Sequence, residues 1–183
     1  MASLIVDANY RFIAASQEVN ARVTQRQQAL AMYVSILVGL LAAVVALRPG
    51  AGSATAAPVE WLVLAFPIAS ICFAFLNYKA ERAITNLRTF MSELERLDDM
   101  HARLPSYNTD PRWSQGANHA RRFHDYAVAV FVAGGNALGL GAARVIHPLR
   151  FAEMPAFIWV AGVLGLAAFV LVWLTPRWSY SPV

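Results

Sequence analysis

Residues 79–125 read KAERAITNLRTFMSELERLDDMHARLPSYNTDPRWSQGANHARRFHD, and this stretch decides how the rest of the chain is arranged. It is the one long polar segment of the protein, with 8 of the 15 basic residues and 7 of the 11 acidic residues. Two pairs of long apolar runs flank it, one pair on each side. Because charged side chains are costly inside hydrocarbon, the flanking runs must leave the whole segment on one side of a bilayer.

The composition is that of a membrane protein with several spans. Of the 183 residues, 58% are apolar and 14% are charged, whereas globular domains carry about 25% charged residues. The apolar runs cover residues 29–47, 59–78, 126–146 and 155–174. Each is close to the ~20 residues that a helix needs to cross the hydrocarbon core. The predicted fold class is therefore all-α, a polytopic membrane protein with four transmembrane helices.

The distribution of Lys and Arg predicts the orientation of these spans. Four spans place both termini on one side, which collects twelve of the fifteen basic residues and leaves Arg48, Arg144 and Arg150 on the other. The positive-inside rule therefore predicts that both termini are cytoplasmic, and usage rich in Ala, Arg and Gly indicates a bacterial inner membrane. The expected parts are a cytoplasmic amphipathic helix (1–28), a first transmembrane hairpin (29–78), a cytoplasmic helix and basic loop (79–125), a second hairpin (126–175) and a cytoplasmic tail (176–183).

Two segments on the cytoplasmic side carry apolar stripes that need a partner in water. One lies in the N-terminal segment, which we expect to form a continuous helix with the first span over residues 4–47. The other lies in a helix that we expect to continue from the second span as far as residue 104, before Pro105. A stalk of these two helices is one interpretation, and a seam for self-association is the other. The seam residues are Ile5, Phe12, Val19, Ile84, Leu87, Met91 and Leu94.

The third span is the glycine-rich one, and it contains an amide side chain near its middle. Small residues let another helix backbone approach closely, and Gly135-x-x-x-Gly139 is a known packing pattern. The partner is either the fourth span of the same chain or a second subunit or pore-lining face. The helix-packing residues are Gly134, Gly135, Asn136, Gly139 and Gly141.

A basic cluster precedes the third span. After a polar loop at residues 106–116, we expect Asn118 to cap the next helix. The cluster is expected to contact anionic lipid or to dock an acidic soluble partner. Its residues are Arg112, Trp113, Arg121, Arg122 and His124. Since the positive-inside rule accounts for the net charge of +4, we expect no direct nucleic-acid partner.

The sequence offers little chemistry. Apart from Glu60, which marks the entry of the second span, Arg144 is the one charge inside a span. There is no nucleophile elbow, phosphate loop or metal-ligand spacing. We therefore expect no catalytic, cofactor or metal site and no enzyme activity. A small transporter or membrane enzyme is a third hypothesis, which would rest on Asn136, Arg144 and Asp125.

Two other hypotheses on function rank above the transporter or membrane enzyme. In the first, the protein self-assembles through its spans as a pore-forming or membrane-perturbing effector or sensor. Its layout is broadly similar to that of the small multi-span effectors of bacterial anti-phage systems, in architecture and not in any residue motif. In the second, it is an accessory membrane anchor that recruits a soluble partner through residues 79–125.

Overall fold

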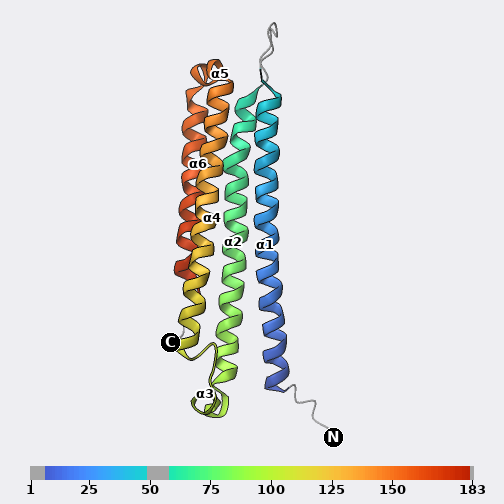
Figure 1. The fold of residues 1–183 in the computed structure, drawn as a ribbon, viewed down its shortest axis with the longest axis vertical. Helices are drawn as coiled ribbons and strands as arrows, with labels where there is room; N and C mark the ends of the chain where they lie inside the picture. The colour runs from blue at the N-terminus through green and yellow to red at the C-terminus, as the bar shows by residue number, and fades with distance from the viewer. Residues whose placement is uncertain (1–6, 49–57, 182–183) are drawn as a thin grey trace.

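The computed structural model describes residues 7–48 and 58–181, except for the side chains of residues 100, 101 and 117–121. The described chain forms helices and contains no strand (Figure 1). The elements in chain order are α1 (Ala8–Ala46), α2 (Val59–Glu95), η1 (Leu97–Asp99), α3 (Met100–Arg103), α4 (Pro111–Ile146), α5 (Pro148–Glu153), α6 (Pro155–Leu174) and η2 (Thr175–Trp178).

Four helices in the described chain are long and apolar enough to span a membrane, which confirms the predicted number. They lie at Ala8–Ala46, Val59–Glu95, Arg122–Ile146 and Pro155–Trp178. The 39 residues of α1 extend for about 58 Å at 1.5 Å per residue, nearly twice the ~30 Å of a hydrocarbon core. α1 is one uninterrupted helix, as predicted, and it is too long to be contained in a bilayer.

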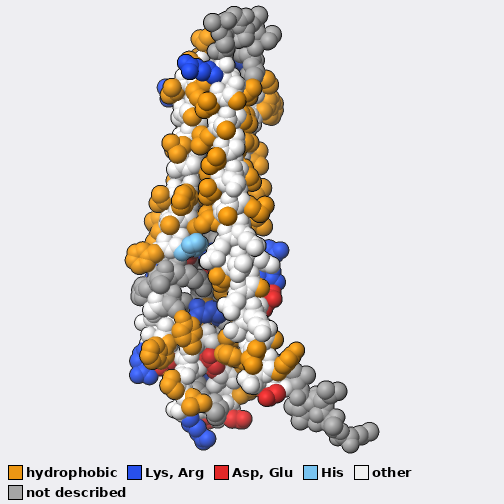
Figure 2. Space-filling view, turned by 45° about the vertical axis from the view of Figure 1, so that its right-hand side comes forward, with side chains coloured by type: hydrophobic (Ala, Val, Ile, Leu, Met, Phe, Trp, Pro, Cys, Tyr) orange, Lys and Arg blue, Asp and Glu red, His pale blue; other side chains and the backbone are white. Residues whose placement is uncertain are grey.

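Charged and apolar side chains separate along the length of the bundle. Figure 2 shows hydrophobic side chains over the upper part and Lys, Arg, Asp and Glu side chains gathered mainly near the lower end. We call this lower part the polar end. It comprises the first half of α1, the second half of α2, η1, α3, the loop that leads to α4, the first turns of α4 and η2. The two apolar hairpins meet the polar end at a common level.

α2 is the central helix of the bundle. It packs against α1, α4 and α6, and α1 and α6 lie on opposite edges of the molecule (Figure 1). The buried core between these helices consists mainly of aliphatic and aromatic side chains, among them Tyr33, Phe66, Phe73, Val128 and Val132. The arrangement leaves the outer sides of α1 and α6 open.

α2 ends earlier than predicted. It stops at Glu95 and not at residue 104, and a 3-10 turn (Leu97–Asp99) and the short α3 come next. Asp98 and Asp99 have φ of 52° and 55°, in the left-handed region that a right-handed helix cannot continue through. Aspartate tolerates this conformation better than most residues, so the pair stops the helix before Pro105 does.

α4 begins earlier than predicted. Its first residue is Pro111, so the loop predicted at residues 106–116 is shorter and Asn118 lies inside the helix. Asp110 is the N-cap, and its side chain accepts a hydrogen bond from the Arg112 backbone N–H at 2.9 Å. Proline at the first helical position is pre-organised for a helix start. The Asp-Pro pair is therefore the better starting signal.

Candidate functional site

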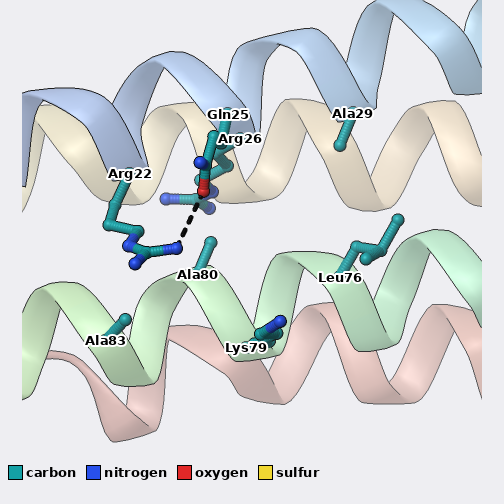
Figure 3. Close-up of a pocket in the computed structure, with 8 residues that line it drawn as sticks. All are labelled: Arg22, Gln25, Arg26, Ala29, Leu76, Lys79, Ala80 and Ala83. Carbon is teal, nitrogen blue, oxygen red and sulfur yellow. Dashed lines mark hydrogen bonds between the residues drawn. The ribbon is translucent and has the colours of Figure 1, made fainter.

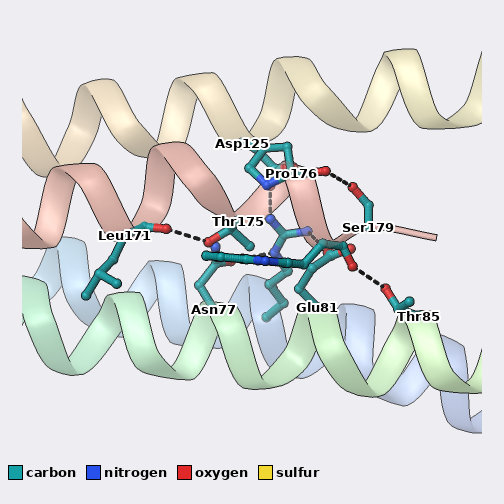
Figure 4. A network of polar contacts seen from close by, with 10 residues as sticks. Asn77, Glu81, Thr85, Asp125, Leu171, Thr175, Pro176 and Ser179 are labelled. Carbon is teal, nitrogen blue, oxygen red and sulfur yellow. Dashed lines mark hydrogen bonds and ion pairs between the residues drawn. The ribbon is translucent and has the colours of Figure 1, made fainter. Parts of the chain in front are cut away.

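A cluster of charged side chains is buried between three helices where the polar end meets the apolar hairpins (Figure 4). Arg26 of α1 lies at its centre and is 6% exposed, and Glu81 of α2 and Asp125 of α4 are 0% and 2% exposed. The Arg26 guanidinium donates to Asn77 Oδ1 at 2.6 Å and to Glu81 Oε2 at 3.4 Å, and it forms an ion pair with Asp125.

Helical spacing brings these residues together. Asn77 and Glu81 are four residues apart, so both project from the same face of α2. Arg22 lies three residues after Val19, and Arg26 lies four residues after Arg22. Arg26 therefore continues the spacing of the apolar stripe in the N-terminal segment. Asp125 precedes the buried Val128 by one turn of α4.

The cluster holds one positive and two negative side chains, a formal sum of −1. Burial lowers the pKa of Arg26 to about 10, so its guanidinium stays charged at neutral pH. A guanidinium presents its donors in a fixed planar fork, which suits it to bind several acceptors at once. The cluster therefore joins α1, α2 and α4 electrostatically.

Two cavities lie on either side of Arg26. One, of about 110 Å³, lies between α1 and α2, and Figure 3 shows Arg22, Arg26 and Lys79 around it. The other, of about 270 Å³, is lined by Arg26 together with Val23, Gln27, Ile84 and His124. Both exceed the volume of a water molecule, ~30 Å³, so each has room for water beside Arg26.

A second, uncharged polar layer lies deeper in the apolar part. The hydroxyls of Tyr33 and Ser70 are 2.8 Å apart, and Ser70 Oγ donates to the Phe66 carbonyl at 2.9 Å. Asn136 Nδ2 donates to Ser70 Oγ at 2.7 Å and to the Val132 carbonyl at 2.8 Å. Asn136 Oδ1 is buried and has no hydrogen-bond donor among the described residues. An unpaired buried acceptor of this kind costs about 1–3 kcal/mol.

A third polar group organises the loop after α2. The Glu95 carboxylate accepts hydrogen bonds from the backbone N–H groups of Asn108 and Thr109, both at 3.2 Å, and from Asn108 Nδ2 at 2.8 Å. The Tyr180 hydroxyl donates to the Asn108 carbonyl at 2.9 Å, and Arg88 lies over the Tyr180 ring. The loop and the C-terminal segment are thus fastened to α2.

The structure distributes the predicted glycine cluster over several environments. A Cβ at Gly135 would lie 2.5 Å from Leu37 Cδ1 of α1, and a Cβ at Gly139 would lie 2.6 Å from the Phe66 ring of α2. The Gly135-x-x-x-Gly139 pair thus serves packing inside the chain. No described atom lies within 4 Å of a Cβ at Gly134 or Gly141.

The predicted basic cluster does not form one patch. Arg112 and Arg122 are ten residues apart on α4, about 15 Å along its axis. Arg112 and Trp113 are exposed, and Arg112 forms an ion pair with Asp110 at 2.7 Å. The hydrogen bonds that Arg112 donates hold the pKa of the Asp110 carboxyl below its usual value. His124 lines the larger cavity beside Arg26. The Arg121 side chain lies outside the described residues.

The described seam residues belong to α1 and α2, two helices that run side by side (Figure 1). Ile84 and Met91 are buried, and Phe12, Val19, Leu87 and Leu94 are half-buried. Ile5 lies outside the described residues, as does the turn between the first two spans.

Sequence reasoning misses the charge cluster as a unit. It connects Asp125 only with the transporter hypothesis. It places Arg26 in the N-terminal amphipathic helix, Asn77 at the end of the second span and Glu81 in the cytoplasmic helix. One signal is present in the sequence: Arg26 continues an apolar stripe at heptad spacing, and a charge at such a position needs a buried partner.

Within the described residues, no group of three or more His, Cys, Asp or Glu side chains is placed to hold a metal ion. Comparison with protein-family models, with curated proteins and with solved structures finds no match for this chain.

Proposed function

We propose that the chain is a non-enzymatic membrane protein that assembles into homo-oligomers through its spans. It resides in a bacterial inner membrane, with both termini and the polar end in the cytoplasm. There it acts as a membrane-perturbing or pore-forming effector or sensor, as in anti-phage systems. The observation that supports assembly is the outward side of α1.

The outward side of α1 carries small residues in the part that crosses the membrane. Ala31, Ser35, Gly39, Ala42 and Ala46 recur at spacings of four and three and are all exposed. We call these five residues the outer ridge. They lie opposite the buried Tyr33, Leu37 and Val44. Small residues are enriched where transmembrane helices contact each other, because they let a second helix backbone approach closely.

The charge cluster gives this assembly a connection to the cytoplasm. Arg26 lies on α1 a little more than one turn before Ala31, and it binds Glu81 and Asp125 on two other helices. Any change at the polar end that moves α2 or α4 therefore acts on the helix that carries the outer ridge. This is the sensing part of the proposal.

Native mass spectrometry in mild detergent tests the assembly. We expect a defined homo-oligomer for the natural sequence and loss of that oligomer in Gly39→Leu. Gly39 is exposed, and a Cβ there would have no atom outside its own stretch of helix within 4 Å among the described residues, so the fold of the single chain should be kept. Val38→Leu, beside the ridge, is the matched control and should stay oligomeric. A natural protein that remains monomeric at high concentration contradicts the proposal.

Dye release from liposomes tests the membrane-perturbing part. We expect the natural protein to release an encapsulated dye and Gly39→Leu to lose this activity together with the oligomer. An oligomer that leaves liposomes intact, with and without added cytosolic extract, would rule out the effector and leave assembly standing.

An accessory membrane anchor is the second candidate. Exposed aromatic side chains at the polar end favour it, among them Phe123, at 76% exposed, together with Tyr107 and Trp113. A soluble partner would be recovered in stoichiometric amount with the natural protein and lost with Arg112→Glu plus Arg122→Glu. Unchanged recovery with these charge reversals would argue against this surface.

A further inference from the structure

We infer that the outer ridge of one copy docks into a groove between α4 and α6 of the next copy. The inference rests on the proposed self-assembly and names its two surfaces. The groove has a volume of about 270 Å³. Its small lining residues are Ala133, Ala137, Ala161, Gly162 and Gly165.

The groove has a polar atom that lacks a partner. Asn136 also lines it, is 5% exposed, and has no hydrogen-bond donor to its Oδ1 among the described residues. This oxygen lies against Gly165, where a Cβ would be 3.3 Å from it. The site therefore calls for a donor carried on a narrow apolar surface, and an acyl chain of a lipid has none.

Ser35 is the one polar residue of the outer ridge and can be that donor. In the single copy its hydroxyl donates to the Ala31 carbonyl at 3.0 Å, the usual local bond of a serine within a helix. Rotation about its Cα–Cβ bond frees the hydroxyl for an acceptor on another helix. Alanine and glycine on either side of it let that helix approach.

The two surfaces lie at the same level of the bundle. Tyr33 reaches Asn136 through Ser70, and Leu37 contacts the α4 backbone at Gly135. Ser35 lies midway between Tyr33 and Leu37, so it is level with Asn136. Copies inserted in the same orientation in one membrane therefore bring Ser35 of one to the height of Asn136 of the next without a vertical shift.

The surfaces also lie on different sides of the molecule. The outer ridge is on α1 at one edge, and the groove borders α6 at the other (Figure 1). A contact between different surfaces is heterologous, so it repeats from copy to copy and closes into a ring or continues as an open chain. It does not stop at a dimer.

Disulfide cross-linking in native membranes tests this contact. Cys72 is the single cysteine, so Cys72→Ser gives a background without thiols. In it, Ser35→Cys combined with Ala137→Cys should give a ladder of dimers, trimers and higher species on mild oxidation. The control pairs Ser35→Cys with Leu138→Cys, which is at nearly the same depth but outside the groove lining, and it should give no ladder.

The outcomes separate this inference from the proposed function. A ladder specific to the Ser35–Ala137 pair supports the inference. Dimers from Ser35→Cys alone would mean that α1 pairs with α1, which overturns the groove but keeps self-assembly. An oligomer in native mass spectrometry without any cross-link through Ser35 also overturns the groove, and a monomer in both measurements overturns both proposals.

Discussion

Arg26 shows at the scale of one residue how a charge is kept inside a helical bundle. Its side chain is surrounded by two carboxylates and an amide from two other helices. A buried ion pair contributes little net stability, but removing one partner destabilises the fold strongly, because the remaining charge stays buried without compensation. The sign of that remaining charge decides which substitution is worst.

Arg26→Met should destabilise the protein more than Asp125→Asn does. The first leaves two buried carboxylates, and we expect it to cost about 3–5 kcal/mol. The second leaves one guanidinium and one carboxylate, a neutral pair. Thermal denaturation of the purified protein in detergent measures the difference. Arg22→Met is the control, since Arg22 pairs with Glu18 at a partly exposed site, and such pairs contribute less than about 1 kcal/mol.

The glycines of α4 provide a second residue-scale test. Gly139→Ala places a methyl group 2.6 Å from the buried ring of Phe66, and overpacking of this kind costs about 1–3 kcal/mol. Gly141→Ala meets no described atom within 4 Å and should be neutral or slightly stabilising, because alanine favours a helix. Equal melting temperatures for the two variants would contradict the observed packing of Gly139.

At the scale of the elements, the end of α2 is set by the turn at its C-terminus. The left-handed conformation of Asp98 and Asp99 turns the chain, and the Glu95 carboxylate then binds the backbone of the returning loop. The predicted stripe has a regular spacing up to residue 104, yet the helix stops at Glu95. Tertiary hydrogen bonds outweigh the helical pattern at this point.

Glu95→Ala should release the loop after α2. The backbone amides of Asn108 and Thr109 lose their acceptor. Because a hydrogen bond to a charged group contributes about 1.5–3 kcal/mol, deuterium exchange at these two amides should accelerate about tenfold or more. Glu95→Gln keeps an acceptor oxygen and should show a smaller effect. Unchanged exchange at both amides in Glu95→Ala would exclude the carboxylate as the organiser of the loop.

At the scale of the whole molecule, the predicted orientation is open to a direct test. In a Cys72→Ser background, Gln17→Cys and Ser181→Cys should react with a membrane-impermeant thiol reagent only from the cytoplasmic side. Leu149→Cys, in the exposed α5 at the other end, should react only from the opposite side. Labelling of intact spheroplasts and inverted vesicles separates the cases, and the reverse pattern would invert the topology.

Composition and hydropathy alone determined that the chain is helical and has four long apolar segments. The reason is physical: a run of about 20 apolar residues forms its own backbone hydrogen bonds in lipid, whatever its neighbours are. Local signals also determined the continuity of α1 and the bounds of α6. Gly39 is the one Pro or Gly within α1, and the helix tolerates it.

Only the tertiary structure decided which side chains meet. Arg26, Glu81 and Asp125 are 44 or more residues apart, and each alone resembles a solvated charge at the edge of a span. The sequence predicts that Asn136 needs a hydrogen-bond partner. The packing of α2, α4 and α6 decides that its amide nitrogen donates to Ser70 and that its oxygen stays unpaired among the described residues. Spacing along one helix shows which residues share a face, and the packing of several helices determines what that face touches.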